Sequence, residues 1–170
     1  MTLDELHEAR VTLARDGIAV LTPAGTLAPV EVAELAPTEG RLRSPVSVGG
    51  FPFGGVLGAA TLTFGTLEDV RDLDGDEDVL RLRLEARAGD AGGPVLDAAG
   101  RVAGLLLPAP GDGARALPAD VAFAAKARAL ESVLQAAGVA SRTSEAAAPI
   151  APEDLTTRAV GMTVLVSCWE

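Results

Sequence analysis

The chain has 170 residues, a formal net charge of −10 and 48% hydrophobic residues, a length and composition that suit one hydrophobic core. The negative charge argues against a nucleic-acid partner, because binding to phosphates needs clustered Lys and Arg. No apolar run approaches the roughly 18 residues of a membrane-spanning helix, and the N-terminus lacks the basic and apolar segments of a signal peptide. No motif calls for a cofactor. Aromatic residues are only 3% of the chain, so Leu, Val and Ala must fill the core.

Short apolar runs separated by turn residues predict a mainly β fold. Leu80, Leu82 and Leu84 alternate with charged residues at the period of a half-buried strand. Residues 97–100 predict a hairpin turn. In chain order, strand-like runs lie at 17–21, 47–50, 60–67, 80–84, 95–96, 102–107 and 123–126. We expect the following side chains to be mainly buried: Val46, Val48, Leu62, Phe64, Leu82, Leu84, Val95, Leu105 and Leu130.

An acidic run at residues 72–78 raises the question of a calcium site. In an EF-hand loop that began at Asp72, the glycine would be sixth and a glutamate twelfth. Here Gly75 is fourth and Arg83 is twelfth, so the pattern does not fit. A solvated hairpin loop is favoured, and no metal site is predicted.

The last part of the chain predicts a helix, a linker, a short helix and a strand. The apolar positions Ala129, Leu130, Val133, Leu134 and Ala137 form one helical stripe, and Gly138 suits the helix end. Small, polar and proline residues follow at 139–152. Proline and acidic residues at 152–154 suit the first turn of a helix. Residues 163–169 predict a closing strand that docks on the barrel.

Residues 89–94 read Gly-Asp-Ala-Gly-Gly-Pro and resemble the nucleophile loop Gly-Asp/Asn-Ser-Gly-Gly-Pro of chymotrypsin-like serine proteases. Residues 47–54 are similar to the segment that opens the second barrel of HtrA/Deg-type and glutamyl-type proteases. Residues 60–67 are similar to their next strand, and 117–134 resemble their last strand and closing helix. Order and spacing fit this family across residues 16–137. The resemblance implies an all-β fold: a trypsin-like six-stranded barrel with a C-terminal helix.

The catalytic triad of that family has no intact counterpart here. The attacking serine falls on Ala91, whose methyl group is no nucleophile. The acid position falls on Gly17, and Asp16 lies one residue early, as a solvated turn residue. The only histidine, His7, lies in a polar stretch too close to Asp16 to hold the family's place, and we expect it at the surface.

Residues 62–67, 89–108 and 162–169 also resemble the C-terminal trypsin-like domain of large bacterial envelope proteins that carry a peptidoglycan-binding domain upstream. That resemblance implies a periplasmic or cell-envelope setting and a domain that often lacks the catalytic serine. It does not imply that this chain itself binds peptidoglycan.

A two-barrel protease domain needs about 200 residues or more, so we expect most of the first barrel to be absent and the chain to be the C-terminal part of a longer protein. The expected parts are 1–40, the end of the first barrel and the connection; 41–138, the second barrel with its helix; 139–152, a linker; and 153–170, an extension with a docking strand.

Cys168 is the single cysteine, so it has no internal disulfide partner. A buried thiol in the terminal strand and a disulfide to an upstream region both remain open. A catalytic role is disfavoured, because no histidine is placed beside it.

The favoured function is a catalytically inactive protease homologue that binds an upstream region of its parent protein or an extended peptide. The resemblance implies that backbone N–H groups of Gly89, Asp90, Ala91, Gly92 and Gly93 form an oxyanion-type loop. A peptide would pair as a strand with Phe123, Ala124 and Ala125.

Two alternatives stay open. One is a working serine endopeptidase whose missing first barrel supplies the histidine and the aspartate. It would need another nucleophile, and Ser44, Ser47 and Thr66 lie in no motif that supports the role. The other is a purely structural domain that packs against its neighbours.

Overall fold

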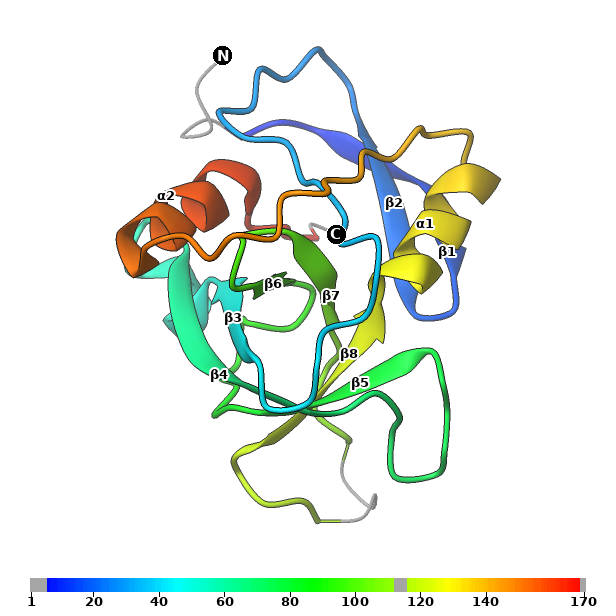
Figure 1. The fold of residues 1–170 in the computed structure, drawn as a ribbon. Coiled ribbons are helices and arrows are strands. Elements are labelled where there is room, and N and C mark those ends of the chain that lie inside the picture. Colours follow the sequence, from blue (N-terminus) through cyan, green and yellow to red (C-terminus); the bar gives the residue numbers. More distant parts are fainter. Residues whose placement is uncertain (1–5, 112–115, 169–170) are drawn as a thin grey trace.

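A computed structural model describes residues 6–111 and 116–168 of the chain. Its centre is a closed antiparallel barrel of six strands in the order β3-β4-β5-β8-β7-β6 (Figure 1). The sequence predictions of a mainly β fold and of a trypsin-like barrel are therefore confirmed. The strands are β3 (Pro45–Gly50), β4 (Thr61–Asp69), β5 (Val79–Arg83), β6 (Pro94–Asp97), β7 (Val102–Leu106) and β8 (Val121–Lys126).

The barrel interior is filled by aliphatic side chains, as the low aromatic content requires. Val48, Leu82 and Val95 are completely buried there. Of the nine side chains expected to be buried, Leu62 and Leu105 are half-buried on the outside of the barrel, and Phe64 is 54% exposed.

The expectation for Phe64 was wrong because the inward-facing positions of β4 are the odd ones. Val46 and Val48 face inward, and their partners across the strand pair are Gly65 and Thr63. Phe64 pairs with Ser47, so it lies on the outer face. A one-residue difference in alternation moves a side chain to the other side of a sheet.

A separate hairpin precedes the barrel and consists of β1 (Ala9–Arg15) and β2 (Ile18–Pro23). Its turn is Asp16-Gly17, with φ of 53° and 75° at the two residues. Two consecutive positive φ values are typical of the type I′ turn, which Asp-Gly favours. The strand predicted to begin at Gly17 therefore begins at Ile18.

Helix α1 (Ala127–Ala136) follows β8 directly and buries Leu130 and Val133 against the barrel. Gly138, with φ of 72°, donates its N–H to Gln135 O, and Val139 N–H donates to Leu134 O. This pair of bonds is a Schellman motif, and it confirms Gly138 as the residue after the helix end.

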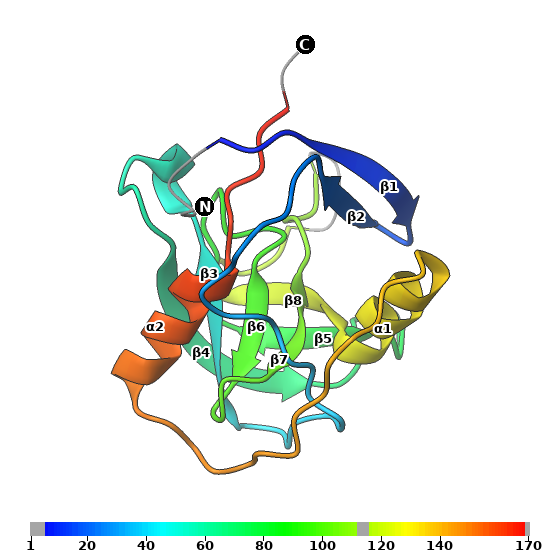
Figure 2. The same cartoon turned by 90° about the horizontal axis from the view of Figure 1, so that it is seen from above.

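The segment predicted as a linker runs over the barrel surface and is hydrogen-bonded to it. Leu35 N–H donates to Arg142 O, Ser144 N–H donates to Leu35 O, and Ile150 N–H donates to Ala98 O. Helix α2 (Pro152–Met162) then packs on the barrel and buries Leu155 and Ala159 (Figure 2). Ile150, Leu155, Ala159 and Met162 therefore belong to the hydrophobic cluster on the outside of the barrel.

The docking strand expected at 163–169 is not present in the described part of it. Residues 163–168 have no strand partner, although Thr163 itself has an extended backbone. Every edge of the closed barrel is already paired, which leaves no place for a further strand. Trp169 lies outside the described residues.

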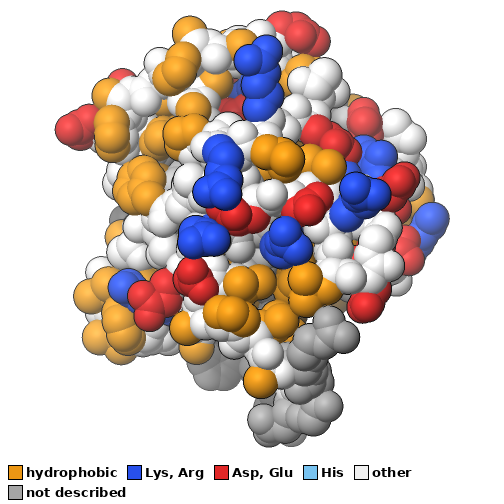
Figure 3. All heavy atoms as spheres, turned by 60° about the horizontal axis from the view of Figure 1, so that its bottom comes forward, with side chains coloured by type: hydrophobic (Ala, Val, Ile, Leu, Met, Phe, Trp, Pro, Cys, Tyr) orange, Lys and Arg blue, Asp and Glu red, His pale blue; other side chains and the backbone are white. Residues whose placement is uncertain are grey.

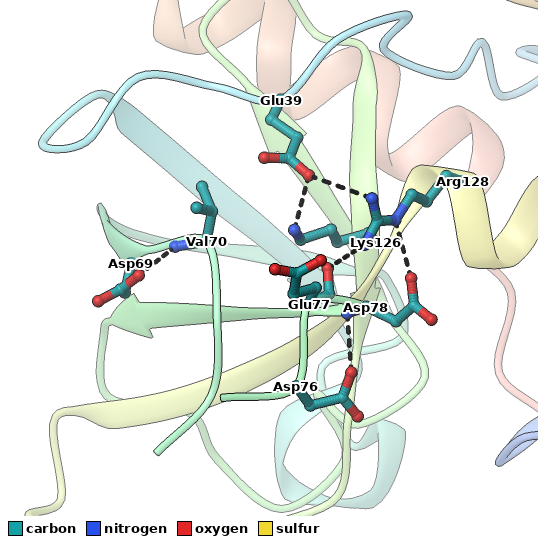
Figure 4. Close-up of polar contacts among 8 residues, drawn as sticks. All are labelled: Glu39, Asp69, Val70, Asp76, Glu77, Asp78, Lys126 and Arg128. Atoms are coloured by element: carbon teal, nitrogen blue, oxygen red, sulfur yellow. Dashed lines mark hydrogen bonds and ion pairs between the residues drawn. The ribbon is translucent and has the colours of Figure 1, made fainter. Parts of the chain in front are cut away.

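An ion-pair cluster joins the connection before β3 to the junction of β8 and α1 (Figure 4). Lys126, only 4% exposed, donates through Nζ to Glu39 Oε1 at 2.6 Å. Arg128 pairs with Asp78 at 2.8 Å and lies 3.9 Å from Glu39. The connection is thus fixed to the barrel by a nearly buried charge.

Among the described residues, no helix combines the length and the hydropathy needed to cross a membrane.

Candidate functional site

The loop at 89–94 lies between β5 and β6, and the side chain of its one acidic residue, Asp90, is buried. Asp90 is 1% exposed. Its Oδ2 accepts the N–H of Arg87 at 2.8 Å, and its own N–H donates to Arg87 O at 3.0 Å. Gly93 N–H donates to Asp90 O at 2.9 Å. These bonds hold the loop in one tight turn.

Glycines let this loop lie directly against the end of β3. A Cβ at Gly93 would overlap the carbonyl oxygen of Gly49, and a Cβ at Gly89 would overlap that of Phe51. A Cβ at Gly50 would overlap the Asp90 carboxylate. Close approach of backbone to backbone therefore explains why glycine is present in both segments.

The loop leaves two backbone donors free. The N–H groups of Asp90, Gly92 and Gly93 donate to carbonyl oxygens of Arg87, Leu106 and Asp90. Within the described part of the chain, the N–H groups of Gly89 and Ala91 have no acceptor, and both residues are exposed. Of the five residues predicted as an oxyanion-type loop, only these two can offer a donor to a ligand.

The structure does not bring an acid or a histidine into a triad with Ala91. Asp16 lies in the hairpin turn with its side chain 68% exposed and paired with Arg15. A side chain at Gly17 would meet no atom within 4 Å, so this position faces open space. His7 is half-buried, and its Nε2 is shielded from solvent without a hydrogen-bond partner among the described residues. The expectation of a surface histidine was therefore wrong.

The predicted peptide-pairing strand has no free edge. Phe123, Ala124 and Ala125 pair with Arg81, Leu80 and Val79 of β5 on one side. On the other side Ala124 and Ala125 pair with Leu106 and Leu105 of β7, and Phe123 O accepts the N–H of Leu107. A peptide cannot add to a strand whose two edges are already paired, so this prediction was wrong.

The other candidate side chains are scattered. Cys168 is exposed rather than buried, and it is a free thiol. Ser47 is 1% exposed beneath the outer face of the barrel, so its hydroxyl is closed to a substrate. The acidic run is a turn in which Asp72 Oδ1 accepts the N–H groups of Asp74 and Asp76. In the described ranges, no group of three or more His, Cys, Asp or Glu side chains is arranged to hold a metal ion.

Residues 3–105 match the family model of the trypsin-like peptidase domain. The chain belongs to this family. No curated protein matches the sequence of this trypsin-like domain.

Solved structures agree with the family. Rv3671c of M. tuberculosis H37Rv, in an inactive form of a serine-to-alanine mutant, is 26% identical with a TM-score of 0.61; the match covers 79% of this chain and 67% of that one. The HtrA-type protease AlgW with a decapeptide is 21% identical with a TM-score of 0.59, over 76% of this chain and 40% of that one. The serine endoprotease from Yersinia pestis is 18% identical with a TM-score of 0.61, over 77% of this chain and 44% of that one. The trypsin-like domain thus spans less than half of the last two proteins, whose likeness shows the fold alone.

No sequence motif pointed to a contact between Arg87, which bonds to Asp90 of the loop, and Phe53. The guanidinium of Arg87 lies 5.8 Å from the centre of the Phe53 ring, within the range of a cation–π contact. Phe53 is 63% exposed and has a φ of 60°, rare for a residue with a side chain. Neither residue belongs to a motif, so only the three-dimensional arrangement identifies them.

Proposed function

We propose that this trypsin-like domain is a non-catalytic protease homologue that serves as a binding or structural domain of a larger bacterial envelope protein. The observation that carries the proposal is Ala91, which is exposed in the loop that resembles the protease nucleophile loop and offers no nucleophile. Asp16, Gly17 and His7 supply no base or orienting acid beside it.

The loop retains a means of binding. The free N–H groups of Gly89 and Ala91 are suited to a carbonyl or carboxylate oxygen, as in an oxyanion hole. The ligand would be an extended peptide or an upstream region of the parent protein. Because β8 has no free edge, such a ligand would be held through the 89–91 backbone rather than through Phe123, Ala124 and Ala125.

A protease assay tests the catalytic part of the proposal. The purified chain, incubated with casein and with short peptide esters, should give no more product than buffer. An Ala91→Gly variant is the matched control for contaminating protease, because neither residue carries a nucleophile. Turnover that stays in constant proportion to both proteins through a further, independent purification step would exclude a contaminant, show a nucleophile elsewhere in the chain and overturn the proposal.

A second candidate is a working serine endopeptidase whose histidine and aspartate come from a region outside this chain. The family match is consistent with it, because the matched family model describes a peptidase domain. It still requires a nucleophile other than Ala91. The two candidates differ in one result: only the second predicts hydrolysis when the domain is produced with its natural upstream sequence.

A peptide titration followed by NMR distinguishes a binding role from a purely structural role. We expect an acetylated peptide with a free carboxylate to shift the N–H resonances of Gly89 and Ala91 in a ¹H–¹⁵N correlation spectrum. The same peptide with an amidated C-terminus is the control for the carboxylate. If neither form shifts these two resonances at millimolar concentration, a structural role is favoured.

A further inference from the structure

Helix α2 covers the outer face of β3 near the point where that strand meets the 89–94 loop. Figure 2 shows α2 on the outside of the barrel, beside β3 and β4. Ala159, which is completely buried, and Thr163, one helical turn later, both face Gly49 of β3. A Cβ built at Gly49 would lie 3.5 Å from Ala159 Cβ and 3.1 Å from Thr163 Oγ1. The backbone of β3 and the C-terminal end of α2 are therefore in close contact.

The same end of β3 also holds the loop. A Cβ at Gly93 would overlap the carbonyl oxygen of Gly49, so the two backbones touch there. Immediately after the strand, Phe51 N–H donates to Gly89 O at 3.0 Å. Residues 49–51 thus connect the end of α2 with the loop that carries the two free N–H groups.

The contact between α2 and β3 contains hydroxyl groups that have no partner. Thr163 Oγ1 and Ser47 Oγ are shielded from solvent and form no hydrogen bond among the described residues. Ser47 lies on the outer face of β3, because its neighbours Val46 and Val48 fill the barrel interior. A buried hydroxyl without a partner lowers stability. Helix α2 itself has only 11 residues, with Gly161 among them, and such a short helix is marginal without its packing. Its contact with β3 is therefore close but weakened.

We propose that α2 is a releasable brace for the 89–94 loop and thereby regulates the ligand site assigned to that loop, an inference that rests on the proposed function. While α2 is docked, the end of β3 is held on its outer face, and the two free N–H groups of the loop keep their arrangement. When α2 leaves, Gly49 loses its contacts with Ala159 and Thr163, and the loop loosens together with the end of β3. Coupling between two sites is reciprocal, so a ligand on the loop also favours docked α2.

Strand β5 provides an internal reference for this coupling. Helix α2 packs mainly on β3, β4 and β6, whereas β5 lies between β4 and β8. Ion pairs join Arg81 of β5 to Asp69 and Arg83 of β5 to Glu68. Figure 3 looks onto the lower part of the molecule as drawn in Figure 1, where acidic and basic side chains lie side by side. Local opening of α2 should leave the amide protection of β5 unchanged.

Amide hydrogen exchange of the full chain, followed by NMR, tests the coupling. Thr163→Val replaces the unpartnered hydroxyl with a methyl group in a side chain of the same shape. It should slow exchange in α2 and at the hydrogen-bonded amides of Gly92 and Gly93 by a common factor of about five or more. Thr157→Val is the matched control, because it changes an exposed threonine of α2, and it should alter neither set of amides. Exchange in β5 should be the same in both variants.

Ala159→Asp acts in the opposite direction. A carboxylate at this completely buried position, against Gly49, should undock α2 and speed exchange in α2 and in the loop at least about tenfold, with β5 unchanged. Val160→Asp places the same charge at an exposed position one residue later and should do neither. If Ala159→Asp does not fold, Thr163→Val alone decides the question.

Three results would overturn the proposal: a change of exchange in α2 without a matching change in the loop, no change in α2 with Thr163→Val, or an equal change in β5. These measurements contain no ligand, so they are independent of the peptide titration. A loop that follows α2 but binds no peptide would contradict the proposed function and leave the coupling in place. A loop that binds peptide but does not respond to α2 would do the reverse.

Discussion

The sequence resemblance assigns the 89–94 loop and the turn of the β1–β2 hairpin to parts of a protease active site, yet the structure supports the two segments very differently. The loop lies against the end of β3, with backbone oxygens where a Cβ at Gly89 or Gly93 would be, and its Asp90 is buried. The hairpin is a two-stranded sheet of its own, with Val11 and Leu21 exposed and open space around Gly17.

This difference distinguishes residues that packing requires from residues that only catalysis would require. Gly50, Gly89 and Gly93 are required by packing, since a Cβ at any of them would overlap the atoms of Asp90, Phe51 or Gly49. At Ala91 and Gly17 no such constraint operates, because both are exposed, and only chemistry would have demanded Ser and Asp there. A domain used for binding or structure would keep the first kind of residue and could lose the second.

Gly93→Ala should give the largest effect. Its Cβ would overlap the Gly49 carbonyl oxygen, and because both atoms belong to packed backbone, β3 and the loop would have to separate. We expect a loss of about 4 kcal/mol in the free energy of unfolding, or no folded protein at all. Urea unfolding followed by circular dichroism measures it.

The control for this prediction is Gly25→Ala. Gly25 has no positive φ and no neighbour within 4 Å of a Cβ, so the change should be within about 0.5 kcal/mol. Similar losses for the two variants would show that close packing is not what fixes the glycine of the loop.

Glu39→Gln asks whether the connection before β3 belongs with the rigid barrel or with the hairpin. The substitution leaves the Lys126 ammonium, 4% exposed, without its carboxylate. Removing one partner of a buried pair leaves an uncompensated charge, and since Glu39 is itself 42% exposed we expect a loss of about 2 kcal/mol. Glu34→Gln, in the same connection and without an ion pair among the described residues, is the control. If Glu39→Gln leaves the free energy of unfolding unchanged, the connection, like the hairpin, is not fixed rigidly to the barrel by this ion pair.

Gly17→Ala tests the hairpin itself. No atom lies within 4 Å of the new Cβ, so the cost comes only from a φ of 75° at a residue with a side chain. We expect a loss of about 1 kcal/mol, visible as faster amide exchange in β1 and β2 with little change in the barrel. Equal changes in both parts would contradict the view that the hairpin is separately supported.

Periodicity and turn chemistry predicted most of the barrel, because each strand carries its own signal. The alternating leucines of β5, the turn after Asp97 and the cap at Gly138 were all found this way. The outward orientation of Phe64 was not predicted, because β4 has hydrophobic or half-buried residues on both faces and its alternation is therefore weak. The terminal strand was predicted although residues 163–168 form none, because β propensity does not reveal that a barrel has no free edge.

For the candidate site, the sequence identified the loop but not what its atoms do. The motif pointed to five backbone donors, whereas three of them are used within the fold. Asp90 and Gly93 donate within the loop itself, and Gly92 donates to Leu106 of β7. The half-buried state of His7 depends on tertiary packing, and the contact of Arg87 with Phe53 joins residues on separate loops. Neither leaves a mark in local sequence.

Ala91→Ser should change the free energy of unfolding least of these variants. It tests the position where catalysis would require a particular residue and packing does not. Ala91 is exposed, so the added hydroxyl should alter the free energy of unfolding by less than about 0.5 kcal/mol. It should not restore proteolysis, because a serine hydroxyl without an adjacent base is a weak nucleophile, and loss of one triad member alone costs several powers of ten in rate. Labelling by a fluorophosphonate probe is the measurement, and the control is Ala99→Ser, which places a serine at a buried position within the 97–100 turn. Stoichiometric labelling at position 91 alone would mean that a working general base lies within reach of this residue. The domain would then lack only the nucleophile, and the proposal of a non-catalytic homologue would be wrong.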